Sequence, residues 1–342
     1  MAFFILSLSA LQAQQSVFQG RRLFADTSVL SIEITLPIDS LLRDDCRRPR
    51  YFEASMYLTN GKDRHKIKLE VRKRAKFRCD PANCSLPPLM VKLNQSDAWG
   101  TIFQGCRKLK ITHPCRPEKK AFQQFIYKEY LIYRMFNQLT DSSFRVRLAH
   151  FTYCDVYSGR TVFDVMGFFI EDDDDLARRI GAKALQATQV PKEKFSPFML
   201  LMTSLFEYMI GNTDFEAETS HNIELLATGI RSPILPVPYD FDWSGLVDAP
   251  YAQPALKTGL TKVTQRWYQG PCPSDTVFQM VLHRFLQKKE VIFSEITATS
   301  LLSASDKKKM LNYLSKFYQE INHTVRFRAM LEKNCKNGRN GR

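Results

Sequence analysis

Hydrophobic and polar residues alternate along much of the chain between residues 28 and 170, a pattern typical of half-buried β-strands. The alternation is clearest over residues 52–78, where two such runs meet at Asn60-Gly61, a strong hairpin signal. Further strands are predicted within residues 28–45, 86–94, 106–114, 144–159 and 161–173. We therefore predict an N-terminal part that is mostly antiparallel sheet.

A long helix with one apolar stripe is predicted from about Glu118 to Gln138. Glu129 lies on that stripe, and a buried carboxylate needs a cation or hydrogen bonds. The alternative is a Glu at the edge of the stripe that reaches solvent. A basic strand containing Lys108 and Lys110 comes directly before the helix, which favours a paired Glu129.

A second, more apolar helix is predicted after Ser196, a suitable N-cap, with Pro197 at its first position and Gly211 at its end. A polar loop follows that carries Asp214 and Asn222. A short strand then leads to a Tyr-Asp-Phe-Asp run over residues 239–242, and the chain beyond Pro250 is mostly helical. Acidic and amide side chains spaced this closely can build a divalent-metal and phosphate site.

This order of elements predicts a sheet-rich lobe over 28–170, a helical lobe over 171–335 and a disordered tail over 336–342. The fold class is α+β, and the order matches the two-lobed protein-kinase-like fold. In kinases a strand lysine pairs with a helix glutamate, and the loop after a buried helix supplies an Asp and an Asn. Lys110 is the candidate lysine, with Lys108 and Lys92 as alternatives.

The chain begins with a short apolar run, which Ala-Leu-Gln-Ala follows. Small residues at this spacing are typical of a signal-peptidase site, so we predict a signal peptide over residues 1–13 and an exported protein. A basic segment before the apolar run is missing, which indicates a truncated or misplaced start. The alternative is a buried N-terminal strand or helix.

Eight cysteines are present: Cys46, Cys79, Cys84, Cys106, Cys115, Cys154, Cys272 and Cys335. In an exported protein some of them are expected to form disulfides. Cys79 and Cys84 enclose a turn-like Asp-Pro-Ala-Asn loop that could close on itself. The chain has no Cys-x-x-Cys pair and only six His, so we favour disulfides over a zinc site.

The net charge is +14 and the isoelectric point is about 9.4, which invites a nucleic-acid partner. The basic residues are scattered, however, and the chain has no zinc-ligand array or RNA-binding aromatic signature, so we expect no nucleic acid. A positive surface also suits nucleotides, envelope polymers or lipid head groups. No apolar run is long enough for a membrane-spanning helix, so none is expected.

Five motifs between Leu69 and Cys272 together resemble a known family. They are KLKIT before His and Cys, KEYLIYRMFNQLT, IGNTD with a later His-Asn, VPYDFDWSGLVDAPYA, and RWYQGPC. The chain is similar in these motifs to the spore-coat CotH kinase-like proteins, in particular to their envelope-associated bacterial relatives. The resemblance implies an atypical kinase that uses ATP with Mg²⁺ or Mn²⁺ to phosphorylate Ser or Thr of proteins in a bacterial periplasm or cell envelope.

The resemblance also implies residue roles. Asp214 is the candidate catalytic base, and Asn222 and Asp240 are candidate metal ligands, with Asp242 assisting Asp240. Lys110 and Glu129 are the candidate pair that positions the nucleotide phosphates. The implied partners are a nucleotide, a protein substrate and components of the cell envelope.

Two features depart from the family pattern. The segment over residues 72–88 contains no glycine, and Ala75 stands where relatives often have Gly, so a β-carbon hinders close approach of the backbone to phosphate. Arg74 and Arg78, with Arg72 and Lys76 nearby, can supply charged contacts instead. Asp214 and Asn222 are also eight positions apart, whereas the kinase pattern spaces them by five. Either the loop bulges, or His221-Asn222 is only an approximate counterpart of the kinase motif.

Three functions therefore remain open from the sequence. The first is an exported, ATP- and metal-dependent kinase, although ATP is scarce outside the cytoplasm. The second is a pseudokinase or envelope binding protein, which the missing glycines favour. The third is a metal-dependent phosphoester hydrolase that uses Asp214, Asp240 and Asp242.

Overall fold

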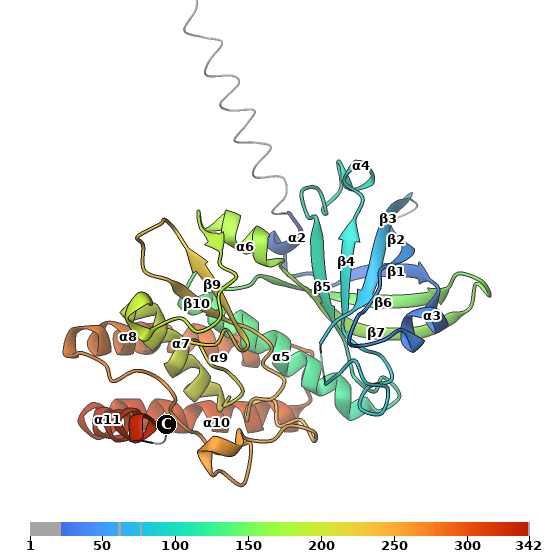
Figure 1. The fold of residues 1–342 in the computed structure, drawn as a ribbon. Coiled ribbons are helices and arrows are strands. Elements are labelled where there is room, and N and C mark those ends of the chain that lie inside the picture. Colours follow the sequence, from blue (N-terminus) through green and yellow to red (C-terminus); the bar gives the residue numbers. More distant parts are fainter. Residues whose placement is uncertain (1–21, 61–62, 76, 341–342) are drawn as a thin grey trace, which may run out of the picture. The chain divides into compact units, whose positions relative to one another are not determined.

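The structure, a computed structural model, describes residues 22–60, 63–75 and 77–340, and its chain divides into two compact units (Figure 1). Unit 1 holds residues up to Gln123 together with Arg145–Asp172, and unit 2 holds Gln124–Phe144 and the chain from Asp173 onward. The division differs from the predicted lobes because most of the long helix belongs to the second unit. The predicted signal peptide lies outside the described residues.

Seven strands of unit 1 form a closed barrel in the order β1-β2-β3-β4-β5-β7-β6 (Figure 1). Their bounds are β1 (Leu30–Leu36), β2 (Phe52–Asn60), β3 (Asp63–Lys73), β4 (Leu89–Leu93), β5 (Lys108–Thr112), β6 (Val146–Asp155) and β7 (Thr161–Ile170). Short helices α2 (Arg22–Ala25), α3 (Ile38–Arg43) and α4 (Gln95–Ala98) lie between or before them. The predicted hairpins β2–β3 and β6–β7 are both present as antiparallel pairs.

The protein-kinase-like fold predicted from the sequence is wrong, because unit 1 is not an open antiparallel sheet. Strand β1 runs parallel to β6 along its whole length, from Leu30 opposite Ala149 to Leu36 opposite Asp155. The other strand pairs of the barrel are antiparallel, so the barrel is mixed. Local alternation shows which face of a strand is buried but not which distant strand lies beside it, so the closure left no signal.

The interior of the barrel is filled by the apolar side chains of the predicted alternation. On β3, Ile67, Leu69 and Val71 are buried in the core, whereas Lys66 and Lys68 between them are exposed. Each fully buried aliphatic side chain of this kind contributes roughly 1.5–3 kcal/mol by leaving water. The barrel therefore presents a continuous polar outer face along β3.

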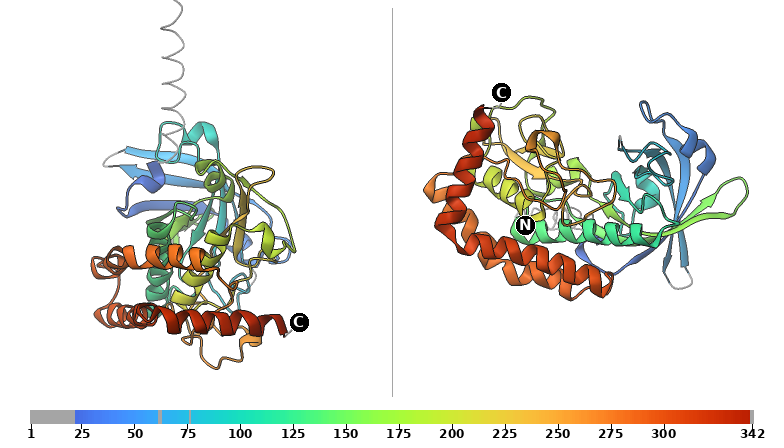
Figure 2. Two further views of the ribbon diagram at one scale, coloured as in Figure 1. Left: turned by 90° about the vertical axis from the view of Figure 1, so that its left-hand side faces the viewer. Right: turned by 90° about the horizontal axis from the view of Figure 1, so that it is seen from below.

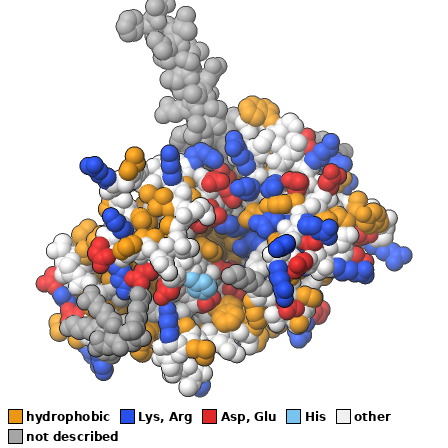
Figure 3. All heavy atoms as spheres, viewed as in Figure 1, with side chains coloured by type: hydrophobic (Ala, Val, Ile, Leu, Met, Phe, Trp, Pro, Cys, Tyr) orange, Lys and Arg blue, Asp and Glu red, His pale blue; other side chains and the backbone are white. Residues whose placement is uncertain are grey.

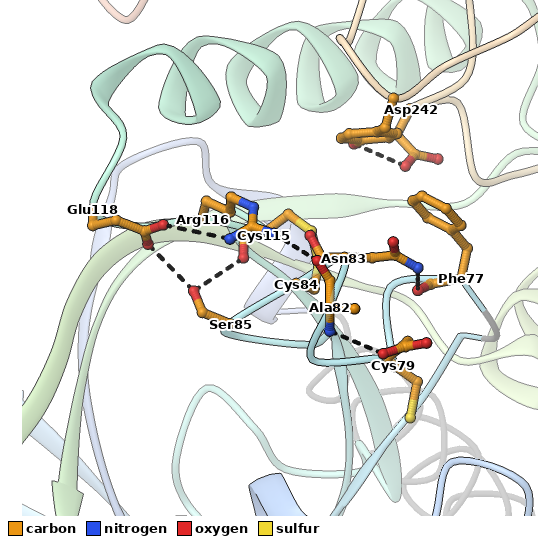
Figure 4. Close-up of a disulfide and its surroundings, with 12 residues drawn as sticks. Phe77, Cys79, Ala82, Asn83, Cys84, Ser85, Cys115, Arg116, Glu118 and Asp242 are labelled. Atoms are coloured by element: carbon orange, nitrogen blue, oxygen red, sulfur yellow. Dashed lines mark hydrogen bonds and ion pairs between the residues drawn. A yellow bond between two sulfur atoms is a disulfide. The ribbon is translucent and has the colours of Figure 1, made fainter.

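Three disulfides link distant parts of the sequence: Cys46–Cys79 and Cys84–Cys115 in unit 1, and Cys272–Cys335 in unit 2. Cys79 and Cys84 thus have different partners, and the expectation that their loop closes on itself is wrong. Figure 4 shows Ser85 beside the second bridge, where its hydroxyl donates to the Cys115 carbonyl at 3.3 Å. Disulfides persist in oxidising compartments, so the three bridges indicate an environment outside the cytoplasm.

Helix α7 (Pro197–Ile210) is the centre of unit 2, and every residue from Met199 to Ile210 is buried. As predicted, the Ser196 hydroxyl accepts from the Met199 amide, and Gly211 ends the helix at a φ of 69°. The left-handed conformation explains why a glycine is needed at this end. Most of α5 (Lys120–Leu139) also belongs to this unit.

The remaining elements of unit 2 are one small sheet and five helices. The antiparallel sheet has the order β10-β9-β8, with β8 (Lys183–Ala184), β9 (Ile223–Ala227) and β10 (Leu235–Pro238). The helices are α6 (Asp173–Arg179), α8 (Asp275–Gln287), α9 (Lys289–Thr297), α10 (Ala304–Asn322) and α11 (Thr324–Asn340), besides short 3₁₀ turns at Lys192–Lys194 and Leu256–Thr258.

The last two helices, drawn in red, follow one another at His323 (Figure 2). Helix α11 runs to Asn340, into the segment for which the sequence predicts disorder. Within the described part of the chain, none of the helices combines the length and apolar character that crossing a bilayer requires.

Candidate functional site

The loop that follows α7 is held in place by its own first residues. The Asn212 amide donates to the Glu207 carbonyl at 2.8 Å, and the Asn212 side-chain oxygen accepts from the Asp214 amide at 3.0 Å. Thr213 adds two contacts, because its hydroxyl accepts from the Ala255 amide and its carbonyl accepts from the Gln269 side chain. The backbone just before Asp214 is therefore held by contacts to α7 and to residues later in the chain.

Two side chains, those of His221 and Asn222, contact Asp214. The His221 Nε2 lies 2.8 Å from one carboxylate oxygen of Asp214, and the Asn222 Nδ2 donates to the other at 3.0 Å and to the Asp214 carbonyl at 2.7 Å. The eight-residue spacing is absorbed by a tight turn, in which Glu216 and His221 exchange two backbone hydrogen bonds. Because these bonds use Nδ2 of Asn222, its carbonyl Oδ1 can serve as an acceptor or metal ligand.

The small sheet brings the second acidic pair to the same loop. Pairing of β9 with β10 ends at Ile223 opposite Pro238, and the next amide, of Tyr239, donates to the Asn222 carbonyl at 3.1 Å. Asp240 therefore follows directly beside Asn222. Both residues have left-handed backbones, with φ of 53° for Asn222 and 62° for Asp240.

The aromatic residue between the two acids anchors them. Phe241 is fully buried, with ring centroids 4.7 Å from Tyr133 on α5 and 5.7 Å from Phe206 on α7. The Tyr133 hydroxyl also accepts from the Asp240 amide at 2.9 Å. Asp242 is buried on the other side of Phe241 and accepts from the Tyr251 hydroxyl at 3.0 Å. The loop after α7 and the segment after β10 thus carry the four predicted residues Asp214, Asn222, Asp240 and Asp242.

Glu207 lies one helical turn before this loop and is fully buried. Burial raises its pKa well above the usual value for a carboxyl group; the Asn212 amide opposes that shift and the charge of Asp214 adds to it. Among the described residues neither Glu207 oxygen has a hydrogen-bond partner. Burial without such a partner favours the neutral form of this carboxyl group.

Sequence reasoning missed Glu207, Asn212 and Tyr133 as contributors to this loop. An acidic residue inside the otherwise apolar helix PFMLLMTSLFEYMI is an anomaly that could have indicated Glu207. Tyr133 looks in the sequence like one more apolar residue of the long helix. Its hydroxyl function depends on a contact with Asp240 that sequence spacing does not reveal.

The predicted lysines lie on strands β4 and β5 of the unit 1 barrel. Lys110 on β5 is buried and stands opposite Met90, whereas Lys108 stands opposite Lys92 on β4. Glu129 on α5 is buried, which contradicts the alternative of a solvent-exposed Glu. Lys110 and Glu129 belong to different units, each described by itself, so their pairing stays a prediction.

Arg74 and Arg78 converge on one buried histidine in unit 1. Burial, and then the positive charges of Arg78 and Arg74, lower the pKa of His113 to about 3, so this side chain is neutral. The Arg74 guanidinium also donates to the Thr112 hydroxyl at 2.9 Å. Ala75 next to Arg74 has a left-handed φ of 73°, and Lys76 lies outside the described residues.

The donor set of the unit 2 loop suits a hard divalent cation. Carboxylate and amide oxygens are preferred by Mg²⁺ and Mn²⁺, and Mg²⁺ often takes only one or two protein carboxylates beside substrate phosphates. Within the described ranges there is no cluster of three or more His, Cys, Asp or Glu arranged to hold a metal. A metal held by Asn222 and Asp240 would therefore need phosphate oxygens and water to complete its shell.

Comparison with known proteins gave no match: neither a protein-family model nor a curated protein sequence matches this chain. The resemblance to the CotH kinase-like family therefore stays a prediction.

Proposed function

We propose that unit 2 carries a divalent-metal-dependent phosphotransfer site that transfers phosphate from ATP to Ser or Thr of an exported protein. One observation carries the proposal: side-chain hydrogen bonds join Asp214, His221 and Asn222, and the Tyr239 amide, one residue before Asp240, donates to the Asn222 carbonyl. We further propose a bacterial periplasm or cell envelope as the location, which the three disulfides support in its coarser form.

Each side chain has a distinct task in the proposed reaction. Asp214 accepts the proton of the attacking hydroxyl, and its two hydrogen-bonded neighbours hold the carboxylate in one orientation. Asn222 and Asp240, with Asp242 behind them, hold the metal. A bound Mg²⁺ or Mn²⁺ neutralises charge on the phosphate oxygens during transfer. The roles of Lys110, Glu129, Arg74 and Arg78 in positioning the nucleotide phosphates stay predictions.

Backbone strain supports a functional role for this loop. A left-handed backbone costs an L-residue about 1–2 kcal/mol, and Asn222 and Asp240 both adopt it. Strain of this kind persists where the surrounding structure holds it, here through β9–β10 pairing and the Tyr133 contact. The loop is thus organised before any ligand binds, which is the condition for efficient electrostatic stabilisation.

Thermal unfolding of the Asp240→Ala variant with ATP and MnCl₂ tests the proposed metal ligands. The unaltered protein should gain about 2.7 kcal/mol at a ligand concentration of 100 times the dissociation constant. Asp240→Ala should lose most of that gain, because one of two metal ligands is missing. Asp248→Ala is the matched control, since Asp248 is an exposed acid of the same unit with a φ of 55°. Equal stabilisation of all three proteins by the ligands would contradict the proposal.

Asp214→Asn separates catalysis from binding. This variant should keep the stabilisation by ATP and Mn²⁺ but transfer phosphate to protein at least 100-fold more slowly, because general-base catalysis is worth about 10²–10⁴-fold. Transfer is measured with γ-labelled ATP and an extract of exported proteins. Release of inorganic phosphate without labelled protein would instead favour the hydrolase.

A nucleotide-binding protein without catalysis is the second candidate. It is favoured by Ala75, whose β-carbon occupies a left-handed position in a segment without glycine over residues 72–88. This candidate predicts stabilisation by ATP and Mn²⁺ with no labelled protein and no phosphate release above the level of Asp214→Asn.

A further inference from the structure

The outer face of the unit 1 barrel carries a broad groove of about 880 Å³, formed across β2, β3, β4 and the start of β5. Figure 3 shows Lys and Arg side chains, in blue, gathered over the strands of this unit. A volume of this size equals on the order of thirty water molecules, which is far more than one small ion needs. Lys110, the first candidate for the phosphate lysine, does not line the groove, whereas the alternatives Lys92 and Lys108 do.

Positive charge dominates the groove. Its basic lining residues are Lys66, Lys68, Lys92, Arg107 and Lys108. Against these five cations stand two carboxylates, Glu53 and Glu70, which leaves an excess of three positive charges. The groove therefore attracts an anionic ligand but is not uniformly basic.

The strand register places two pairs of like charges opposite one another, on either side of the opposite-charge pair Glu70 and Lys92. Lys92 on β4 is the direct cross-strand partner of Lys108 on β5, and Glu53 on β2 is the partner of Glu70 on β3. Directly opposed like charges destabilise a sheet. A ligand with anionic groups near the lysines and hydrogen-bond donors near the glutamates offsets both costs.

Aromatic rings contact two of the groove's cations, Lys92 and Lys66. The Lys92 Nζ lies 3.6 Å from the Tyr51 ring centroid and 3.7 Å from a Glu70 carboxylate oxygen. The Tyr57 ring has Arg64 at 3.9 Å and Lys66 at 5.9 Å from its centroid. Cation–π contacts of this kind reduce the side-chain entropy that binding would otherwise cost.

We propose that this groove binds an acidic glycan, a polysaccharide with carboxylate or sulfate groups spaced between neutral hydroxyls. Glu53 and Glu70 repel a polymer that is charged at every unit, such as nucleic acid or polyphosphate, but accept hydrogen bonds from sugar hydroxyls. Ser55 and Asn94 add neutral polar groups to the lining. The oxidising environment indicated by the disulfides is also where such glycans occur on cell surfaces.

Isothermal titration of the full chain with a sulfated octasaccharide, a carboxylated uronate octamer and a neutral octamer tests the proposal. The two acidic probes should bind, with an affinity that falls as salt rises, and the neutral octamer should not. Lys68→Gln with Lys108→Gln should weaken binding at least tenfold. Lys308→Gln with Lys309→Gln, on exposed positions of α10 in unit 2, is the matched control and should bind unchanged.

A second measurement uses the unaltered protein and so does not depend on the folding of a variant. Saturating acidic octasaccharide should protect Lys66, Lys68 and Lys92 from amine acetylation, as read by mass spectrometry, and should leave Lys308 reactive. Absence of binding by both acidic probes would overturn the proposal. Equal loss in the control variant, or tighter binding of polyphosphate or single-stranded DNA than of either glycan, would overturn it as well.

Discussion

The two units secure their polar side chains in opposite ways. Unit 1 closes seven strands into a barrel, adds two disulfides, and keeps its buried His113 neutral. Unit 2, over its described residues, has a single disulfide and instead builds a loop of acids and amides on the buried helix α7, where side-chain hydrogen bonds and left-handed backbones set the geometry. The difference indicates that unit 1 depends on the closure of strands and disulfides, whereas the unit 2 site depends on hydrogen bonds within its loop, together with more distant contacts such as that of Tyr133.

Removal of both unit 1 disulfides should have the largest effect. The bridges Cys46–Cys79 and Cys84–Cys115 join residues 33 and 31 positions apart, and closing a loop of that length stabilises by about 3–4 kcal/mol in the chain-entropy model. With all four cysteines replaced by Ser, unit 1 should lose on the order of 7 kcal/mol. Hydrogen exchange resolved by peptide should then show rapid exchange in β2–β5.

Two controls define what that loss means. Cys154→Ser removes a free, half-buried cysteine and should leave the exchange of the barrel unchanged. Cys272→Ser with Cys335→Ser opens a bridge with a separation of 63 and should destabilise unit 2 by about 4 kcal/mol. If the unit 2 variant speeds hydrogen exchange in β2–β5 as much as the unit 1 variant does, the stability of the barrel does not depend specifically on the unit 1 disulfides.

His113 should make unit 1 sensitive to acid. Its folded pKa of about 3 lies below the unfolded value of 6.5, so the unfolded chain binds more protons between these two pH values. The stability is fully present above about pH 6.5 and is lost as pH falls toward 3. At about 1.4 kcal/mol per pKa unit, the full loss is on the order of 5 kcal/mol.

Urea unfolding of the unaltered chain and of His113→Gln at several pH values measures how much His113 contributes to the loss of stability in acid. The variant cannot titrate at this position, so its unfolding free energy should fall less between pH 6.5 and 3. His283→Gln replaces an exposed histidine of unit 2 and should follow the unaltered chain. Parallel pH profiles for His113→Gln and the unaltered chain would show that another group controls acid unfolding.

The same contrast explains what could be predicted from the sequence. Ser196, Pro197 and Gly211 bound α7 as predicted because helix caps act within a few residues of the chain. The loop with Asp214 and Asn222 could be located for the same reason. The closure of β1 on β6 and the partners of Cys79 and Cys84 could not be predicted, because long-range pairing depends on the assembled fold.

The residues of the candidate site show the same difference between local and long-range features. Asp214, Asn222 and Asp240 could be predicted as acids and amides after a buried helix, but the bonds that orient them could not. His221 contacts Asp214 only because the turn at Glu216 brings it back, and Tyr133 comes from a helix far earlier in the chain. Residues that support a site through tertiary contacts look in the sequence like ordinary core or loop residues.

The smallest expected effects come from two glycine substitutions at left-handed positions, and they should differ in sign. Ala75 in unit 1 has a φ of 73° and no polar side chain, so Ala75→Gly should stabilise by about 0.5 kcal/mol, the relief of strain less the extra unfolded-state entropy of glycine. Asn222 in unit 2 has a φ of 53° but donates two hydrogen bonds to Asp214, so Asn222→Gly should destabilise by about 1 kcal/mol.

Urea unfolding with local hydrogen exchange measures both substitutions. If Asn222→Gly stabilises the protein, the hydrogen bonds from Asn222 to Asp214 contribute less free energy than the strained backbone of Asn222 costs. That result would argue against a preorganised loop. Destabilisation by Ala75→Gly would mean that the segment over residues 72–88 is held by its β-carbon, which would favour a structural role over phosphate approach. If Ala75→Gly stabilises and Asn222→Gly destabilises, the left-handed backbone of unit 2 is held by side-chain hydrogen bonds and that of unit 1 is not. Only the Asn222 substitution removes a hydrogen bond along with the strain.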